Sequence, residues 1–185
     1  MKLPVKWAGA SLAMSAMVAY TGCQKSDPSG NAESPAPVTN GQPSIEDILP
    51  KQAQPKLPTI KVWVGAEELE TEIALNGQQQ MTGMMWRTNM PDNTAMIFVH
   101  PAPRQAAYWM KNCYVPLSIA YIDTDGVILE IHNMQPHNTN SVVSASQNVR
   151  FALETPQGWF QRHNVNTGAV VRTERGSLAA TFLRR

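Results

Sequence analysis

A proline-rich segment confines the part of this chain that can fold. Seven of the 14 prolines lie between residues 24 and 58, among Ser, Asn, Gln and Gly and with few large apolar side chains. This composition buries too little apolar surface to offset the entropy of an ordered chain, so we expect a disordered tether over residues 23–58. Within it, Ser44 could cap one helical turn with Asp47, which Pro50 would end. The sequence therefore predicts a single β-rich domain over residues 59–185.

The start of the chain has the pattern of a secretory signal peptide. Lys2 and Lys6 precede an uncharged, mostly apolar run over residues 8–20, which is shorter than the about 20 apolar residues that a membrane-spanning helix needs. We therefore predict a signal peptide over residues 1–22, and an exported protein.

The end of this run resembles the lipobox of bacterial lipoproteins. Gly22 and Cys23 fit it, while Tyr20 stands where leucine is usual. The resemblance implies that Cys23 receives a lipid and tethers the domain to a membrane in the cell envelope. Because Gln24 is not aspartate, it also implies the outer membrane, facing the periplasm, if the source has two membranes. The alternative is simple cleavage, which would leave a secreted or periplasmic soluble protein.

The charge pattern argues against a nucleic-acid partner. The formal net charge is +1, and acidic and basic residues are mixed along the sequence. No basic stripe is present of the kind that follows a phosphate backbone, so we expect no binding to nucleic acid.

Period-two alternation and turn signals predict a strand-rich domain. Asn76 and Thr155-Pro156 read as the starts of two short helices, the second running to about His163. The expected strands are 60–64 with 69–75, 95–99, 106–110, 117–122 with 127–134, 149–154 and 169–173. We therefore predict a mainly β fold with minor helices (α+β), either a small β-barrel or a folded antiparallel sheet, plugged by two short helices.

A cation and an amide interrupt an apolar run at residues 109–117. In a strand, Trp109 and Lys111 share a face, which could form a ligand platform with Asn112. In the structural alternative, Lys111 reaches the rim of the domain and pairs with Glu154, while Asn112 bonds the turn before Pro116. Both alternatives remain open at the level of sequence.

Arg87, Cys113 and the histidines are the other chemical candidates. Arg87 ends the first predicted helix, where it could clamp an anion, or complement the helix dipole and anchor to a carboxylate. Cys113 lacks a local cysteine-protease signature, so we do not expect it to be a nucleophile. No Cys or acidic cluster accompanies His132 and His137, and no phosphate loop or serine elbow is recognisable. We expect no metal and no cofactor.

Several segments together resemble the family called domain of unknown function 192. They occur in the family's order and spacing over about residues 60–171: Gly83–Arg87, Ala95–Val99, Trp109–Asn112, Pro116–Leu117, Ala152–Glu154, Gly158 and Gly168. The resemblance implies a small β-rich domain, often exported in bacteria, whose molecular activity is not assigned. The family usually has arginine, threonine and aspartate where this chain has Thr82, Cys113 and Ser118.

Three functional hypotheses follow. The first is a membrane-tethered envelope domain that binds a small molecule or an envelope protein through Trp109, Lys111 and Asn112. The second is an envelope enzyme that uses Lys111, Asn112, Arg87 and Glu154 as a polar cluster, which requires these groups to converge in one pocket. The third is a structural domain without a ligand.

Overall fold

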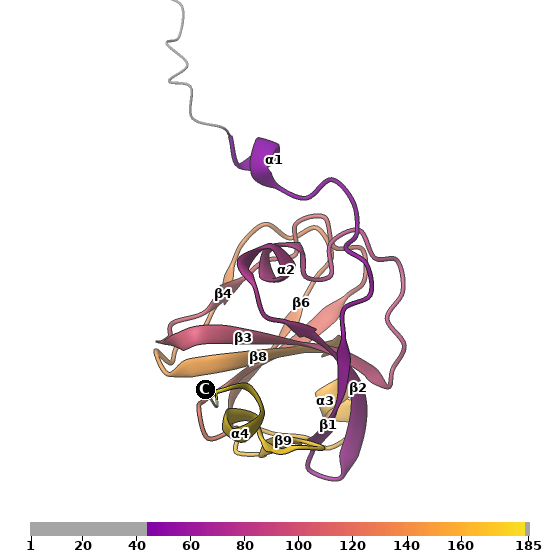
Figure 1. Ribbon diagram of the computed structural model, residues 1–185. Helices are drawn as coiled ribbons and strands as arrows, with labels where there is room; N and C mark the ends of the chain where they lie inside the picture. Colours follow the sequence, from indigo (N-terminus) through magenta and orange to yellow (C-terminus); the bar gives the residue numbers. More distant parts are fainter. Residues whose placement is uncertain (1–43, 184–185) are drawn as a thin grey trace, which may run out of the picture. The chain divides into compact units, whose positions relative to one another are not determined.

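The computed structural model describes residues 44–183, which form an α+β domain built on one large sheet (Figure 1). The strand order in this sheet is β10-β9-β1-β2-β3-β8-β5-β6, and β4 pairs with β7 separately. The strands are β1 (Thr59–Val64), β2 (Glu67–Ala74), β3 (Thr94–Arg104), β4 (Ala107–Tyr108), β5 (Leu117–Ile122), β6 (Ile128–Met134), β7 (Val142–Val143), β8 (Val149–Pro156), β9 (Val171–Thr173) and β10 (Gly176–Ser177). The helices are α1 (Ile45–Ile48), α2 (Gly77–Thr82), α3 (Trp159–Arg162) and α4 (Leu178–Phe182).

The mainly β prediction is confirmed. Of the two predicted forms, the barrel is wrong, because the sheet is not closed. No ladder joins β10 to β6 in the described part of the chain, although an isolated bridge between Val127 and Val170 links the segments that precede β6 and β9. The sheet is also not wholly antiparallel, because β2 and β3 pair in parallel. A parallel pair needs a crossover connection, and α2 lies within it. Four short helices, rather than two, accompany the sheet.

Local signals account for the hairpins and for α2. β1 and β2 pair antiparallel, as do β5 and β6, at the places where alternation and turn residues predicted hairpins. At the start of α2, Asn76 accepts a hydrogen bond from the backbone N–H of Gln79 at 2.9 Å, and the Gln79 side chain reaches back to Asn76 N at 3.2 Å. This capping box satisfies backbone groups that would otherwise lack partners at the helix start.

Three predicted elements end or begin elsewhere. The first predicted helix, α2, ends at Thr82, so Arg87 lies in the loop that follows it and not at the helix end. Pro156 is the last residue of β8, and α3 begins only after Gly158, which has a φ of 77°. The strand expected over 106–110 stops at Tyr108, so that Trp109, Lys111 and Asn112 lie in a loop. Asn112 has a φ of 58°, which is a left-handed conformation incompatible with a strand.

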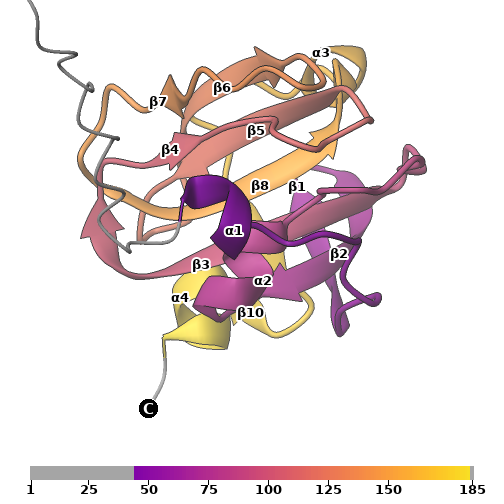
Figure 2. The ribbon, with the colours of Figure 1, turned by 90° about the horizontal axis from the view of Figure 1, so that it is seen from above.

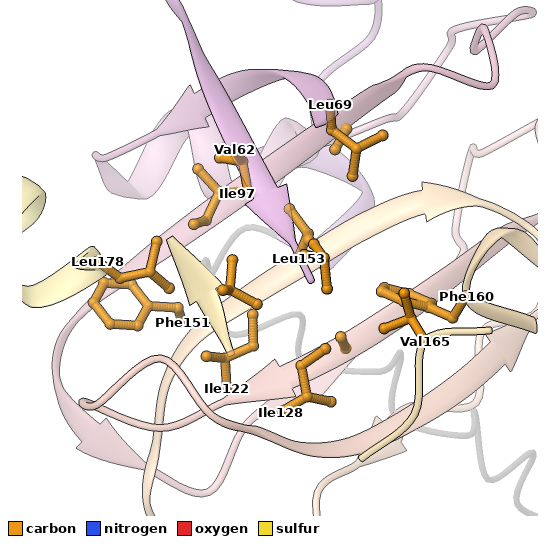
Figure 3. Packing of buried hydrophobic residues seen from close by; sticks show 14 of the residues in the cluster. Val62, Leu69, Ile97, Ile122, Ile128, Phe151, Leu153, Phe160, Val165 and Leu178 are labelled. Carbon is orange, nitrogen blue, oxygen red and sulfur yellow. The ribbon is translucent and has the colours of Figure 1, made fainter. Parts of the chain in front are cut away.

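The central strands carry a hydrophobic cluster on each face of the sheet. All six residues of β5 are buried, and β8 lies between β5 and β3 (Figure 2). On one face, Ile97, Leu153 and Ile122 pack with residues of α3 and α4 (Figure 3). On the other face, Met96 and Tyr121 pack in a methionine-rich cluster. Strands buried on both faces read as continuous apolar runs, which explains why alternation fails there.

Residues 45–58, which the sequence assigned to the tether, contact this second cluster. The predicted turn is present as α1, and Ser44 and Asp47 form its capping box. Leu49 is buried in the methionine-rich cluster, and Pro50 O accepts a hydrogen bond from Trp86 Nε1 at 2.9 Å. The predicted signal peptide and the predicted lipidation site, Cys23, lie outside the described residues.

Candidate functional site

Arg87 lies in a cleft beside the parallel pair of strands. Its guanidinium donates from Nη1 and Nη2 to the two carboxylate oxygens of Glu72 on β2, at 2.5 and 2.8 Å. The side chains are only 17% and 12% exposed, respectively. Burial alone would raise the pKa of Glu72, but hydrogen bonds from Arg87 and from Leu57 N outweigh it and lower that pKa. Both side chains are therefore charged, and their two hydrogen bonds fix the orientation of the Arg87 guanidinium.

The cleft beside this pair is small and mostly apolar. Its volume is about 250 Å³. Met84 and Ala95, which are both buried, lie in its lining. The full lining is Lys56, Glu72, Met84, Arg87, Asn89, Met90, Pro91, Thr94 and Ala95. An apolar surface with a few polar groups at fixed positions is typical of a ligand pocket, here at the lower end of the usual size.

Lys111 has a different partner from the one that the structural alternative expected. Its ammonium pairs with Glu46 of α1, and it lies 5.8 Å from the centroid of the Trp109 ring. The Lys111 side chain is 19% exposed. Asn112 acts through its backbone, since its carbonyl accepts a hydrogen bond from Trp86 N at 2.7 Å. This bond holds the segment that carries Arg87.

Glu154 is buried without a charged partner. It lies on β8 opposite Met96 of β3 and Ile119 of β5, so its side chain points into the methionine-rich face. Its Oε2 atom is buried and has no hydrogen-bond partner among residues 44–183, and burial raises the pKa of Glu154 to about 8. Glu154 is therefore mostly protonated at neutral pH.

The structure separates the predicted site residues into three places. Glu72, Met96 and Glu154 are opposite one another on β2, β3 and β8, so Met96 stands between the Arg87–Glu72 pair and Glu154. Trp109, Lys111, Asn112 and Glu154 line none of the main clefts of the described residues. The sequence did not single out Glu72, Lys56 or Met90. Glu72 is one of four glutamates along β2, so no sequence signal distinguished it.

Cys113 and the histidines have structural surroundings. Cys113 is buried, and burial, followed by the charge of Glu154, raises the pKa of its thiol to about 12. His132 Nε2 lies 3.0 Å from Glu130 Oε2. Within residues 44–183, no group of three His, Cys, Asp or Glu side chains is placed to hold a metal ion.

We predict that the Cys113 thiol reacts slowly in the native chain. A rise of about three units in pKa lowers the thiolate fraction about 1000-fold, and burial restricts access further. In a Cys23→Ser chain at pH 8, Ellman's reagent should modify Cys113 at least about 100-fold more slowly than in the same chain unfolded in urea. Comparable rates would contradict the burial of this thiol.

Comparison with known proteins places the chain in a family. The model of DUF192, described as "Uncharacterized ACR", matches residues 60–173. The chain belongs to the DUF192 family. The match starts at the second residue of β1 and ends at the last residue of β9, so it spans the sheet from β1 to β9 and includes Arg87, the Trp109–Asn112 loop and Glu154.

Two crystal structures show the same fold. One is of a protein from Sinorhizobium meliloti 1021 described as a candidate transcription regulator, with 28% identity and a TM-score of 0.61, covering 65% of this chain and 98% of that chain. The other is of a protein of unknown function from Novosphingobium aromaticivorans, with 26% identity and a TM-score of 0.61, covering 71% of this chain and 99% of that chain. No curated protein matches the chain. Among the described helices, none has the length and apolar character needed to cross a membrane.

Proposed function

We propose that this chain is an exported, membrane-tethered binding domain, and that the Arg87 cleft is its ligand site. The tether would run from a lipid on Cys23 to the domain. The ligand would be a small molecule with an apolar part and one anionic group. The signal-peptide pattern and the lipobox resemblance support the location, and the geometry of the cleft supports the ligand class.

The proposal rests on the cleft because its lining is mostly apolar and includes the charged pair of Arg87 and Glu72. Met84, Met90 and Ala95 offer surface for an apolar group. At the edge, the Lys56 side chain is 67% exposed, so its ammonium can reach a ligand anion by leaving its surface pair with Glu70. Exposed pairs of this kind contribute only about 0–1 kcal/mol, so exchange of the partner costs little.

Binding is favoured over catalysis by the separation of the predicted polar cluster. Arg87 is paired with Glu72, Lys111 is paired with Glu46, and Glu154 is buried among apolar side chains. A nucleophile or general base must lie within hydrogen-bond reach of the reacting group. These side chains do not share a cleft in which one substrate could touch them all.

A short fatty acid tests the ligand class. Hexanoate should bind the full chain more tightly than either hexylamine or acetate, which lack the anion or the apolar chain, in a titration followed by ligand-observed NMR. Met90→Trp, which fills the cleft, should weaken hexanoate binding at least about tenfold, a loss of about 1.4 kcal/mol. Met81→Trp is the matched control, because Met81 is exposed and lies outside the cleft. Equal affinities for both variants would show that hexanoate binds outside the cleft and would contradict the proposed site. No binding would favour the structural-domain hypothesis.

The tether is tested separately by membrane fractionation. Cys23→Ser should move the protein from the membrane fraction to the soluble envelope fraction, because it removes the acceptor of the lipid. Cys113→Ala should stay with the membrane, since that thiol is buried in the domain. A Cys23→Ser chain that remains in the membrane fraction would contradict the lipid anchor.

A further inference from the structure

Two arginines lie at an irregularity between β3 and β8, and neither has a carboxylate partner among residues 44–183. Pairing is regular up to Val99 and Phe151 and resumes only at Arg104 and Val149. Arg150 lies within this interruption and donates from Nη1 to the carbonyl of His100. Strand irregularities of this kind re-aim side chains and are frequent beside binding sites.

The positive charges of Arg104 and Arg150 are not neutralised by ion pairs within residues 44–183. Neither Arg104 nor Arg150 forms an ion pair with any carboxylate of residues 44–183. Burial, then Arg104, then Arg150 lower the pKa of the intervening His100 to about 4. Arg104 uses Nε to bond Gln105 O at 3.2 Å, which leaves both of its terminal nitrogens free to donate.

A groove of about 480 Å³ is lined by both arginines and by apolar side chains. Its lining includes the basic side chains of Arg104 and Arg150, together with His100 and the apolar side chains of Leu75 and Phe182. Leu75 is 58% exposed, so its side chain offers apolar surface to a ligand in the groove. A smaller hollow of about 150 Å³, which reaches Tyr108, shares Gln80, His100 and Arg104 with the groove and so adjoins it.

We propose that this groove is a second binding site, for a phosphate monoester that carries an apolar group. The phosphate oxygens would accept hydrogen bonds from Arg104 and Arg150, and the apolar group would cover Leu75 and Phe182. Guanidinium groups suit this role because their planar donors match phosphate oxygens in pairs. The site is distinct from the Arg87 cleft, since the two have no lining residue in common.

The test uses hexyl phosphate with the full chain. Calorimetry and the NMR signals of the His100 ring measure the binding. The affinity for hexyl phosphate should fall at least about tenfold in Arg104→Gln and in Arg150→Gln. Arg172→Gln is the matched control, because Arg172 is an exposed arginine on β9 that lines neither hollow. Arg150→Lys keeps the charge but loses the paired donors, so it should bind more weakly than the wild type and more tightly than Arg150→Gln.

Vesicles distinguish a soluble ester from a lipid headgroup. Binding to phosphatidic acid vesicles, but not to phosphatidylcholine vesicles, would identify the headgroup as the source if Arg104→Gln abolishes it. Binding to hexyl phosphate alone, with the same dependence on Arg104, would identify a soluble ester. Absence of binding to both probes, or an equal loss in Arg172→Gln, would overturn the proposal.

Discussion

Replacing Glu154 by glutamine should stabilise the protein, and the gain should grow with pH. With a pKa of about 8 in the folded state against 4.5 in the unfolded state, the ionisable carboxyl costs about 4 kcal/mol of stability at pH 8 and about 1 kcal/mol at pH 5. Glutamine has nearly the same shape and no charge to desolvate. Urea unfolding at the two pH values should therefore show a larger increase in the free energy of unfolding at pH 8.

The sign of this effect follows from proton binding. Between pH 4.5 and 8 the folded chain holds a proton on Glu154 that the unfolded chain releases, so stability falls as pH rises. Glu130 provides a control with the opposite sign. Burial alone would raise the pKa of Glu130, but hydrogen bonds from Ser146 N, Ala145 N and His132 outweigh it and lower that pKa. Glu130→Gln should therefore destabilise the protein at pH 8, and a stability that falls in Glu154→Gln would contradict the buried, unpaired carboxyl.

Among glycine-to-alanine substitutions at the turns, Gly126→Ala should lower the stability of the protein the most. Gly126 has a φ of 87°, and a Cβ atom there would lie 2.7 Å from the carbonyl oxygen of Val171. The two segments are joined at this point, because Val171 N donates to Gly126 O at 2.8 Å. We expect a loss of about 3 kcal/mol in the free energy of unfolding, from backbone strain and from separation of the segments.

Gly168→Ala separates these two causes. Gly168 has the same φ of 87°, but a Cβ atom there would meet nothing within 4 Å. We expect it to cost only the about 1 kcal/mol of the left-handed conformation. Urea unfolding of both variants measures the difference, and equal losses would show that the contact with Val171 is not close.

The sequence predicts the parts of the fold that depend on neighbouring residues. The hairpin of β5 and β6 follows from the turn at residues 123–126, where Asp123 Oδ1 accepts hydrogen bonds from Asp125 N and Val127 N at 2.9 and 2.8 Å. The start of α2 follows from Asn76 and Gln79. Both signals lie within a few residues of the structure that they specify, so no knowledge of the tertiary fold is needed.

The parts that the sequence does not predict depend on distant residues. Lys111 pairs with Glu46, 65 residues earlier, in a segment whose composition is that of a linker. No turn signal in the sequence predicts the parallel pairing of β2 with β3, because the two strands are connected by a crossover through α2. The Arg87 cleft has the same origin, since Lys56, Glu72 and Met90 come from three separate segments. The periodicity and spacing of residues in the sequence do not predict such contacts between distant segments.

Methyl NMR of the methionines tests the proposed ligand site most directly. Met84 and Met90 line the Arg87 cleft, whereas Met110 and Met134 are buried in the same face of the sheet outside it. In a chain with labelled methionine methyl groups, saturating hexanoate should shift the signals of Met84 and Met90 and leave those of Met110 and Met134 in place. Shifts at Met110 beside Lys111, without shifts at Met84 and Met90, would show that the ligand binds at the Trp109–Asn112 loop and would contradict the proposal.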